Sequence, residues 1–128
     1  MTTVTAAVIE RDGRVLICRR RDDQVHAGKW EFPGGKLEDG EQPAEALLRE
    51  LREELSIEAQ TDGEIERYRY QYPDRKPIEL IFFAVTDFEG EPCYDQFAEV
   101  RWATRRDLPS FDFLDGDVEF VRRLAYQD

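Results

Sequence analysis

The amino-acid sequence predicts an α/β protein in which a mixed β-sheet lies between helices. Apolar residues recur at intervals of three and four after Pro43, and this period predicts an amphipathic helix. Residues Ile78–Val85 are almost continuously apolar, which is typical of a central strand. Two further apolar runs, Val4–Ile9 and Val15–Cys18, flank the turn dipeptide Asp12-Gly13 and predict a hairpin. A sheet with both hairpin pairs and strands joined across a helix is expected to be mixed.

Shorter patterns predict the remaining elements. Residues Trp30–Gly35 form an extended segment that breaks at its proline and glycines and leads toward the helix. The tyrosines of residues 68–72 alternate with polar residues, the period of a half-exposed strand, and a turn follows at Pro73–Pro77. A short strand is expected near Val100–Trp102 and a final helix from about Asp115 to Tyr126. The two helices are expected to cover opposite faces of the sheet.

The helix after Pro43 combines an apolar stripe with an unusually acidic face. Proline suits the first turn of a helix, where its missing N–H needs no partner. The residues expected to form the buried stripe are Ala44, Leu47, Leu48, Leu51 and Leu55.

Three glutamates crowd the polar face of this helix. Glu50 lies three residues from Glu53 and four from Glu54, and each like-charge pair at such spacing costs roughly 0.2–0.5 kcal/mol. One interpretation is a solvated surface on which Arg49 and Arg52 screen the glutamates. The interpretation we favour is a divalent cation, and oxygen ligands without Cys or His suit Mg²⁺ or Mn²⁺.

The order of residues around this helix adds a second argument. Gly35 is followed after five residues by Glu41, after seven more by Arg49-Glu50, and then by an apolar residue, any residue and Glu53-Glu54. Ser56 and an apolar residue complete the run. This spacing resembles the signature box of the Nudix hydrolases. Ser56 departs from the box, which has glycine there; serine reaches the left-handed conformation at roughly 1–2 kcal/mol, so activity is still expected.

The resemblance extends beyond the box and implies a fold. Residues 30–41, 72–75 and 89–92 are similar to the MutT branch of the family, and the similarity covers nearly the whole chain, loosely after residue 92. It implies a Nudix-type α/β/α sandwich with a mixed sheet, formed as a single domain by residues 1–128.

The resemblance also implies a metal centre. Glu50 and Glu54 are expected to be metal ligands, with Glu53 supporting the cluster and Glu50 also orienting or deprotonating the attacking water. Arg49 is expected to pair with a carboxylate and hold it in position. A further ligand is expected from the backbone carbonyl of Gly34. The alternatives left open are Glu41 as a ligand through water or as a supporting partner, and Asp95 as a loop ligand with Glu91 and Glu99 as rivals.

Substrate contacts are expected from the same resemblance. Arg20 lies where relatives place a phosphate-binding arginine, with a surface ion pair as the alternative. Phe32, beside the Pro-Gly-Gly turn, is expected to stack a base, whereas Trp30 and Phe111 are more typical of a core. Asp112 occupies the position expected to read the base, and an ionised carboxylate suits the paired donors of guanine. The full predicted set is Arg20, Glu31, Phe32, Pro33, Gly34, Lys36 and Asp112, with Arg75 a further candidate.

Composition limits the partners. The 128 residues include 18 basic and 29 acidic side chains, a formal charge of −11, which disfavours binding to long nucleic acids but allows a small nucleotide held by a few placed cations. The N-terminus lacks an export signal and no segment is long and apolar enough for a membrane span, so a cytoplasmic monomer or homodimer is expected.

The sequence therefore predicts a Mg²⁺-dependent nucleoside triphosphate pyrophosphohydrolase that releases a nucleoside monophosphate and pyrophosphate. The expected substrate is 8-oxo-dGTP or dGTP, in the cleaning of the nucleotide pool that protects DNA. A CTP or modified-dCTP pyrophosphohydrolase is the alternative within the class. A non-catalytic nucleotide-sensing Nudix module is the alternative from another class, and a purely structural helix is a third.

Overall fold

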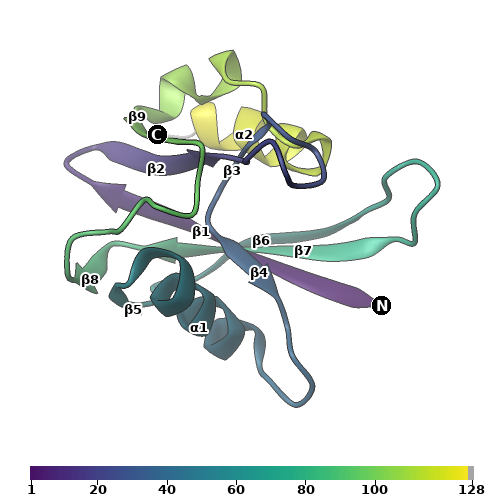
Figure 1. The fold of residues 1–128 in the computed structure, drawn as a ribbon, viewed down its shortest axis with the longest axis horizontal. Helices are drawn as coiled ribbons and strands as arrows, with labels where there is room; N and C mark the ends of the chain where they lie inside the picture. Colours follow the sequence, from purple (N-terminus) through teal and green to yellow (C-terminus); the bar gives the residue numbers. More distant parts are fainter. Residues whose placement is uncertain (127–128) are drawn as a thin grey trace.

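A seven-stranded mixed sheet organises the protein, for which a computed structural model describes residues 1–126 (Figure 1). The last two residues of the domain predicted over 1–128 lie outside the described part. The strands of the large sheet are β1 (Thr2–Arg11), β2 (Arg14–Arg19), β3 (Trp30–Glu31), β4 (Gly34–Lys36), β6 (Gly63–Tyr70), β7 (Ile78–Val85) and β9 (Glu99–Ala103). The helices are α1 (Pro43–Leu55), the 3-10 turns η1 (Arg105–Ser110) and η2 (Asp115–Asp117), and α2 (Val118–Ala125). A separate two-stranded sheet joins β5 (Glu58–Gln60) and β8 (Asp87–Glu89).

The pairing of β1 confirms the mixed sheet. β1 pairs antiparallel with β2 across the predicted turn, where Asp12 and Gly13 have φ of 54° and 76°. It pairs parallel with β7 from Thr2 opposite Ile78 to Ile9 opposite Val85. β7 pairs antiparallel with β6 on its other side, so the apolar run forms a central strand as predicted.

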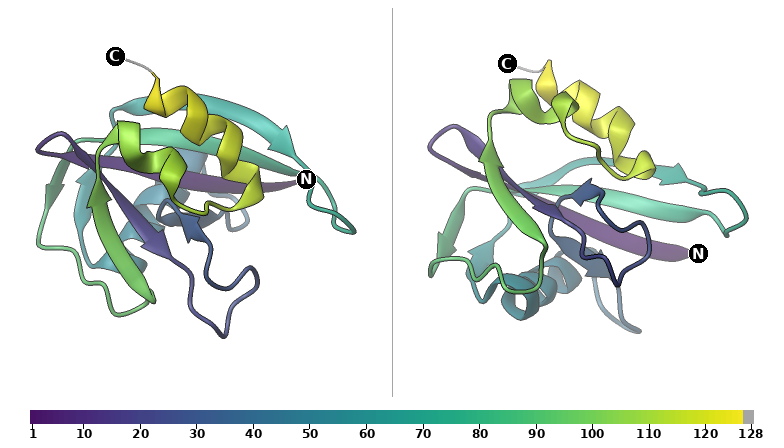
Figure 2. Two further views of the ribbon diagram at one scale, coloured as in Figure 1. Left: turned by 90° about the horizontal axis from the view of Figure 1, so that it is seen from above. Right: turned by 45° about the horizontal axis from the view of Figure 1, so that its top comes forward.

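The two helices cover opposite faces of the sheet, which confirms the predicted sandwich (Figures 1 and 2). Alternate residues of β1 belong to different apolar cores: Ala6 and Val8 pack with α2, whereas Ala7 and Ile9 pack with α1. Within residues 1–126, no helix is both long enough and apolar enough to span a membrane.

The buried side of helix α1 lies closer to its acidic face than predicted. Leu47, Leu51 and Leu55 are fully buried as expected, but Ala44 and Leu48 are only half-buried and Ala46 is buried instead. Ala46 lies one and two helical turns before Glu50 and Glu54, so these three residues form one row along the helix. That row faces β4, so Ala46 takes the buried place that was predicted for Leu48, whereas Ala44 still packs against the edge of the core.

The helix ends at Ser56 in the left-handed conformation, with φ of 59° and ψ of 34°. Its N–H donates to the carbonyl of Arg52 at 3.1 Å. Since glycine adopts this conformation without the penalty of a Cβ atom, we expect Ser56→Gly to raise the free energy of unfolding by about 1 kcal/mol and to leave activity unchanged. Urea denaturation measures the change. A lower stability for the glycine variant would contradict this account of the helix end.

Tyr72 lies outside the strand in which it was predicted, because β6 ends at Tyr70. Its hydroxyl accepts a hydrogen bond from the N–H of Gly116 at 3.0 Å, and its ring packs on His26 with the centroids 4.9 Å apart. These contacts draw Tyr72 toward η2 and away from the sheet. The predicted final helix is likewise divided, since η2 precedes the α-helical turns of α2.

Candidate active site

Strand β4 and helix α1 come into close contact through two glycines. A Cβ atom on Gly34 would lie 2.1 Å from the carbonyl oxygen of Thr5 in β1. A Cβ atom on Gly35 would lie 2.4 Å from the carboxyl carbon of Glu50. Both distances are shorter than van der Waals contact. At Gly34 the clash is with backbone, so glycine is required for β4 to lie against β1, whereas at Gly35 a side chain would displace the carboxylate of Glu50.

Arg49 binds several of the carboxylates near α1. Its Nε and Nη2 atoms donate to the two oxygens of Glu41 at 2.8 and 3.0 Å. Its Nη1 atom donates to Glu50 and to Glu53, both at 3.1 Å, and Nη2 also reaches the carbonyl of Lys36 at 3.1 Å. The paired hydrogen bonds from Arg49 lower the pKa of Glu41. Glu41 thus fixes the guanidinium that in turn positions Glu50 and Glu53.

Glu54 is the most buried carboxylate of the row and has a different environment. It accepts a hydrogen bond from the N–H of Gly34 at 3.2 Å. Burial, followed by the charges of Glu31 and Glu50, raises its pKa to about 8. Burial also raises the pKa of Glu50 and of Glu31, although Arg49 and Arg20 oppose the shifts. A cation beside these carboxylates would stabilise their ionised forms.

The donor set fits a hard divalent cation. Glu50 and Glu54 supply carboxylate oxygens next to the backbone of Gly34, and no sulfur or imidazole lies among the predicted ligands. Within residues 1–126, no three Asp, Glu, His or Cys side chains are already gathered as they would be around a metal ion. Glu53 is more exposed than Glu50 and hydrogen-bonds to Arg49, so binding would require the side chains to adjust.

The loop after β8 approaches the end of α1. Gln96 donates from its side chain to the carbonyl of Glu53 at 2.9 Å, which places its neighbour Asp95 close to the acidic helix. Glu91 instead pairs with Arg11, and Glu99 pairs with Arg19 and Arg101. Of the three candidate loop ligands, Asp95 is therefore the one whose segment lies against α1 and whose carboxylate is not engaged in an ion pair within the described residues. Its role stays a prediction.

A cleft of about 270 Å³ adjoins the carboxylates and contains most of the predicted substrate contacts. Phe32 lines it, although the ring is only 4% exposed and packs in the core against Phe82, Phe113 and Phe120. Pro33 is buried and does not line the cleft; its carbonyl accepts the N–H of Ala7 at 2.8 Å. The predicted residues that do line the cleft are Arg20, Glu31, Phe32, Gly34 and Lys36.

Arg20 forms an ion pair with a neighbour inside the cleft. Its Nη1 atom donates to Glu31 at 3.0 Å and its Nε atom to the carbonyl of Val25 at 2.7 Å. The partner is therefore a half-buried carboxylate beside the cleft, and the guanidinium remains among the lining groups. Both the phosphate contact and the ion pair are compatible with this position.

The structure does not bring Asp112 into the cleft. Its side chain is 73% exposed and accepts a hydrogen bond from Lys29 at 2.9 Å. Besides Glu31, an acid that was not predicted lines the cleft, namely Asp117, which is 6% exposed. Burial, followed by the charge of Glu31, raises the pKa of Asp117 to about 8. The turn that carries it is held by Tyr68, whose hydroxyl donates to the carbonyl of Gly116, and by Tyr72.

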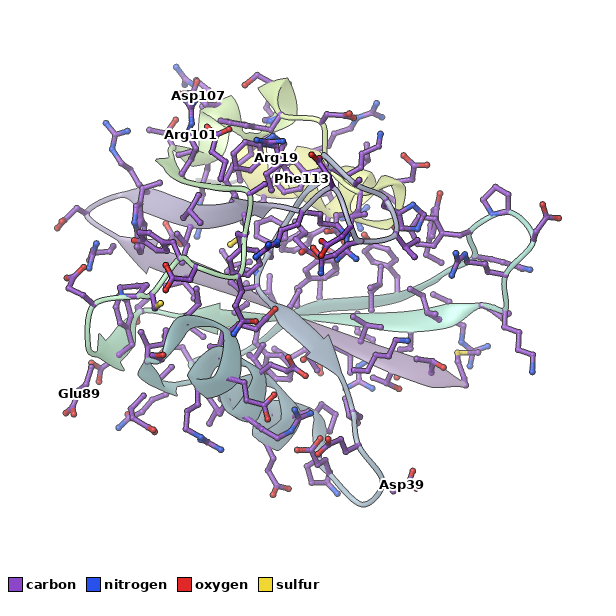
Figure 3. All side chains as sticks on the ribbon, viewed as in Figure 1. Arg19, Asp39, Glu89, Arg101, Asp107 and Phe113 are labelled. Atoms are coloured by element: carbon purple, nitrogen blue, oxygen red, sulfur yellow. The ribbon has the colours of Figure 1, made fainter. Side chains whose placement is uncertain are left out.

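Sequence reasoning missed Asp117 because it assigned this stretch only to the final helix expected from about Asp115 to Tyr126. A signal was present: the residue directly precedes the apolar repeat Val118, Phe120, Val121 and Leu124, and therefore lies at the start of a helix packed on the sheet, although its side chain makes no capping hydrogen bond. By contrast, Asp39, in the loop before α1, and Glu89, at the end of β8, point outward at the edge of the molecule, as acidic residues commonly do (Figure 3).

Comparison with known proteins decides the family. The profile of the NUDIX domain matches residues 1–124 of the chain. The chain belongs to the Nudix family. As a Nudix hydrolase it acts on a phosphoanhydride bond of a nucleoside triphosphate, and Nudix hydrolases generally need a divalent metal.

Nudix relatives with two activities resemble the chain about equally. The CTP pyrophosphohydrolase of Escherichia coli K12 is 37% identical over 121 residues, covering 94% of this chain and 89% of that protein. The 8-oxo-dGTP diphosphatase of the same strain is 37% identical over 113 residues, covering 88% and 87%. Among solved structures, the E. coli ORF135 protein superposes with a TM-score of 0.84 at 34% identity, covering 95% and 86% of the two chains.

The geometry of the Nudix box makes the role of Gly35 testable. A methyl group at this position would meet the end of the Glu50 side chain, which can rotate away without unfolding the protein. We expect Gly35→Ala to keep the melting temperature within a few degrees and to lower kcat about 100-fold, because an ångström-scale displacement of a reacting group has that effect. Steady-state kinetics and thermal denaturation measure the two quantities. Wild-type turnover in Gly35→Ala would show that the position of Glu50 is unimportant.

Proposed function

We propose that this Nudix hydrolase is a Mg²⁺-dependent pyrophosphohydrolase that converts a nucleoside triphosphate into a monophosphate and pyrophosphate. The observation that carries the proposal is the carboxylate row of α1, in which half-buried Glu54 and Glu50 lie against the two β4 glycines that line the cleft. A cytoplasmic location, with the nucleotide pool as the source of substrate, is part of the proposal. Whether the active unit is a monomer or a homodimer does not affect it.

The residues of the chain divide the chemistry between them. Glu50 and Glu54, with the carbonyl of Gly34 and the supporting Glu53, would hold the cation, and Asp95 is the proposed loop ligand. Bound Mg²⁺ supplies neutralisation of phosphate charge and a more acidic water. Glu50 accepts a proton from the attacking water, and Arg49 orients Glu50 through their hydrogen bond of 3.1 Å. Glu41 acts as a supporting partner, because Arg49 occupies both of its oxygens.

The same cleft would receive the base. Phe32 and Leu114 contribute apolar surface to its lining, and Asp117 contributes a polar group. A carboxyl group that keeps its proton at neutral pH presents one donor and one acceptor. Guanine offers two adjacent acceptors, N7 and O6, on its major-groove edge, whereas oxidation at C8 turns N7 into an N–H donor. Neutral Asp117 therefore complements oxidised guanine better than guanine at this edge, and we propose 8-oxo-dGTP as the preferred substrate.

Cytidine nucleotides are the second candidate. Cytosine also presents a donor and an acceptor side by side, so neutral Asp117 complements it equally, and the E. coli relative named CTP pyrophosphohydrolase is as similar as the 8-oxo-dGTP diphosphatase. A non-catalytic sensing role has less support, because Glu50, Glu53 and Glu54 are all present. A purely structural helix also has less support, since Glu50 and Glu54 lie against β4 and are not on a solvated surface.

A product assay tests the proposal. Purified protein is incubated with Mg²⁺ and a panel containing 8-oxo-dGTP, dGTP, dCTP, CTP and dATP, and pyrophosphate and orthophosphate are measured separately. We expect pyrophosphate and the monophosphate, with the highest kcat/KM for 8-oxo-dGTP. Release of orthophosphate would contradict the reaction type. A higher kcat/KM for CTP or dCTP would replace the guanine assignment with the second candidate.

A further inference from the structure

The chain changes its helical winding at Asp117, one of the two acidic residues that line the cleft. Residues 115–117 form the 3-10 turn η2, in which the N–H of Asp117 donates to the carbonyl of Leu114 at 2.9 Å. Helix α2 then begins at Val118. The carboxyl group of Asp117 makes no capping hydrogen bond and has no other hydrogen-bond partner within residues 1–126. The backbone at the junction between η2 and α2 therefore determines where this carboxyl group lies.

The hydroxyl group of Tyr68 lies at this junction, in the place of an α-helical hydrogen bond. In an α-helix the N–H of Phe120 would donate to the carbonyl of Gly116, four residues earlier. Here that carbonyl precedes the first α-helical turn and accepts a hydrogen bond from the Tyr68 hydroxyl at 2.5 Å. Burial, followed by the charge of Asp117, raises the pKa of this hydroxyl, and the nearby N–H of Phe120 opposes the shift. The hydroxyl therefore lies between the two backbone groups that a longer α2 would join directly.

Gly116 is held by side chains from outside its own helix. Its N–H donates to the hydroxyl of Tyr72 at 3.0 Å, and its carbonyl accepts from Tyr68, so tyrosines use both of its backbone hydrogen-bonding groups. A Cβ atom on Gly116 would lie 3.0 Å from the Tyr72 oxygen and 3.2 Å from the ring of Tyr70. The backbone is closely packed at this point, and residues of a distant segment therefore set the position of the residue that follows.

Tyr68 is itself fixed between β6 and α2. Its ring packs on Phe82 with the centroids 5.7 Å apart, and the guanidinium of Arg123 lies 5.6 Å from the ring centroid. Arg123 is in turn held by ion pairs with Glu66 of β6 and Glu119 of α2. Tyr68 does not line the cleft, so it acts on a bound nucleotide only through the turn that it holds.

We propose that Tyr68 is a positioning residue for base specificity, which holds Asp117 at the end of a 3-10 turn so that its carboxyl group faces the base. The inference rests on the proposed function, in which Asp117 contacts the base. Without the hydroxyl, the N–H of Phe120 can bond directly to the carbonyl of Gly116, and α2 would begin earlier. Successive residues turn by about 120° around a 3-10 helix and by about 100° around an α-helix, so the carboxyl group would rotate out of its place in the cleft.

Removing this hydroxyl tests the inference by substrate preference. Tyr68→Phe keeps the ring, and the matched control is Tyr70→Phe, since the hydroxyl of Tyr70 forms no hydrogen bond within the described residues. The ratio of kcat/KM for the preferred nucleotide over that for dATP should fall roughly 10-fold in Tyr68→Phe, through KM and with kcat within about twofold, because one hydrogen bond to the base is displaced. The control should keep the wild-type ratio. Equal ratios for the two variants, or a loss confined to kcat, would overturn the inference.

Nuclear magnetic resonance checks the cause without turnover. The scalar coupling through a hydrogen bond from the amide nitrogen of Phe120 to the carbonyl carbon of Gly116 should be absent in the wild type, where the hydroxyl intervenes, and should appear in Tyr68→Phe. Detection of this coupling in the wild type would overturn the inference even if the variant did not fold. Its absence from a folded Tyr68→Phe would do the same.

Binding separates this inference from the proposed function. The nucleoside monophosphates of the panel are titrated by calorimetry in the presence of EDTA. We expect Tyr68→Phe to bind the preferred monophosphate about 10-fold more weakly than Tyr70→Phe does. The same result in a protein that hydrolyses no nucleotide would support the positioning role and refute the proposed reaction. Equal affinities for the two variants would overturn the positioning role even if hydrolysis is normal.

Discussion

Replacing Glu54 with Gln is expected to abolish most of the turnover and to leave the fold intact. Glutamine keeps the oxygen that accepts the hydrogen bond from Gly34, so the contact between α1 and β4 survives. It removes a negative charge that a divalent cation would require. Since such a cation contributes several kcal/mol to the transition state, kcat should fall on the order of 1000-fold. Steady-state kinetics at saturating Mg²⁺ measure the loss.

The control for this variant is Glu58→Gln, an exposed glutamate just beyond the end of α1. It should retain wild-type turnover. The melting temperature of Glu54→Gln should equal or exceed that of the wild type, because the substitution removes a carboxyl group that is costly to ionise where it is buried. Undiminished turnover in Glu54→Gln would contradict the assignment of the carboxylate row to catalysis.

Asp117 is expected to make base recognition depend on pH. Its carboxyl group retains its proton up to about pH 8 and then loses the donor that the proposed base contact needs. An asparagine side chain in its place would present a donor and an acceptor at every pH. In a comparison of the wild type with Asp117→Asn, the ratio of kcat/KM (wild type over variant) should stay constant below about pH 7 and fall as pH rises through 8. Asp117→Leu should lose about 10- to 100-fold at all pH values.

Stability gives a second measure of the same group. An unfolded aspartate releases its proton near pH 4, whereas buried Asp117 keeps it to about pH 8. The folded state therefore binds more protons between these values, and the free energy of unfolding should decline as pH rises across that window. Asp117→Asn should show a smaller decline, since Glu54, Glu31 and Glu50 still contribute in the same direction. If the kcat/KM ratio and the stability difference between the wild type and Asp117→Asn were both independent of pH across that window, the raised pKa of Asp117 would be refuted.

The helices and strands that could be predicted are those whose burial leaves a periodic or continuous run of apolar residues in the sequence. The amphipathic period placed α1, and the apolar run placed β7 as a central strand, because burial on one or both faces leaves a direct imprint on sequence. The parallel pairing of β1 with β7 is not encoded in either strand alone. The small sheet of β5 and β8 was missed since its strands have three residues each, too few to show a period.

The candidate site was predictable where its residues lie close in sequence. The spacing of the Nudix box predicted that the glutamates of α1 and the glycines of β4 belong to one site, because these residues lie on one strand and on the helix that follows it. Asp117 was missed since its burial depends on η2, the tyrosines of residues 68–72 and Phe32 coming together from distant segments. Asp112, predicted from the order of residues before α2, instead pairs with Lys29 on the surface.

Paramagnetic broadening by Mn²⁺ tests most directly whether the carboxylates of α1 and the backbone of β4 hold a divalent cation. Amide resonances of the protein are recorded during a titration with substoichiometric Mn²⁺. We expect selective loss of signals from residues 34–36 and 50–54, reversed by excess Mg²⁺ and absent in Glu54→Gln. Another hollow of the protein, whose lining includes the acidic residues Glu10, Asp12, Asp87 and Glu91, provides the internal control. Broadening at that hollow without broadening at residues 34–36 and 50–54 would refute a metal centre at the Nudix box.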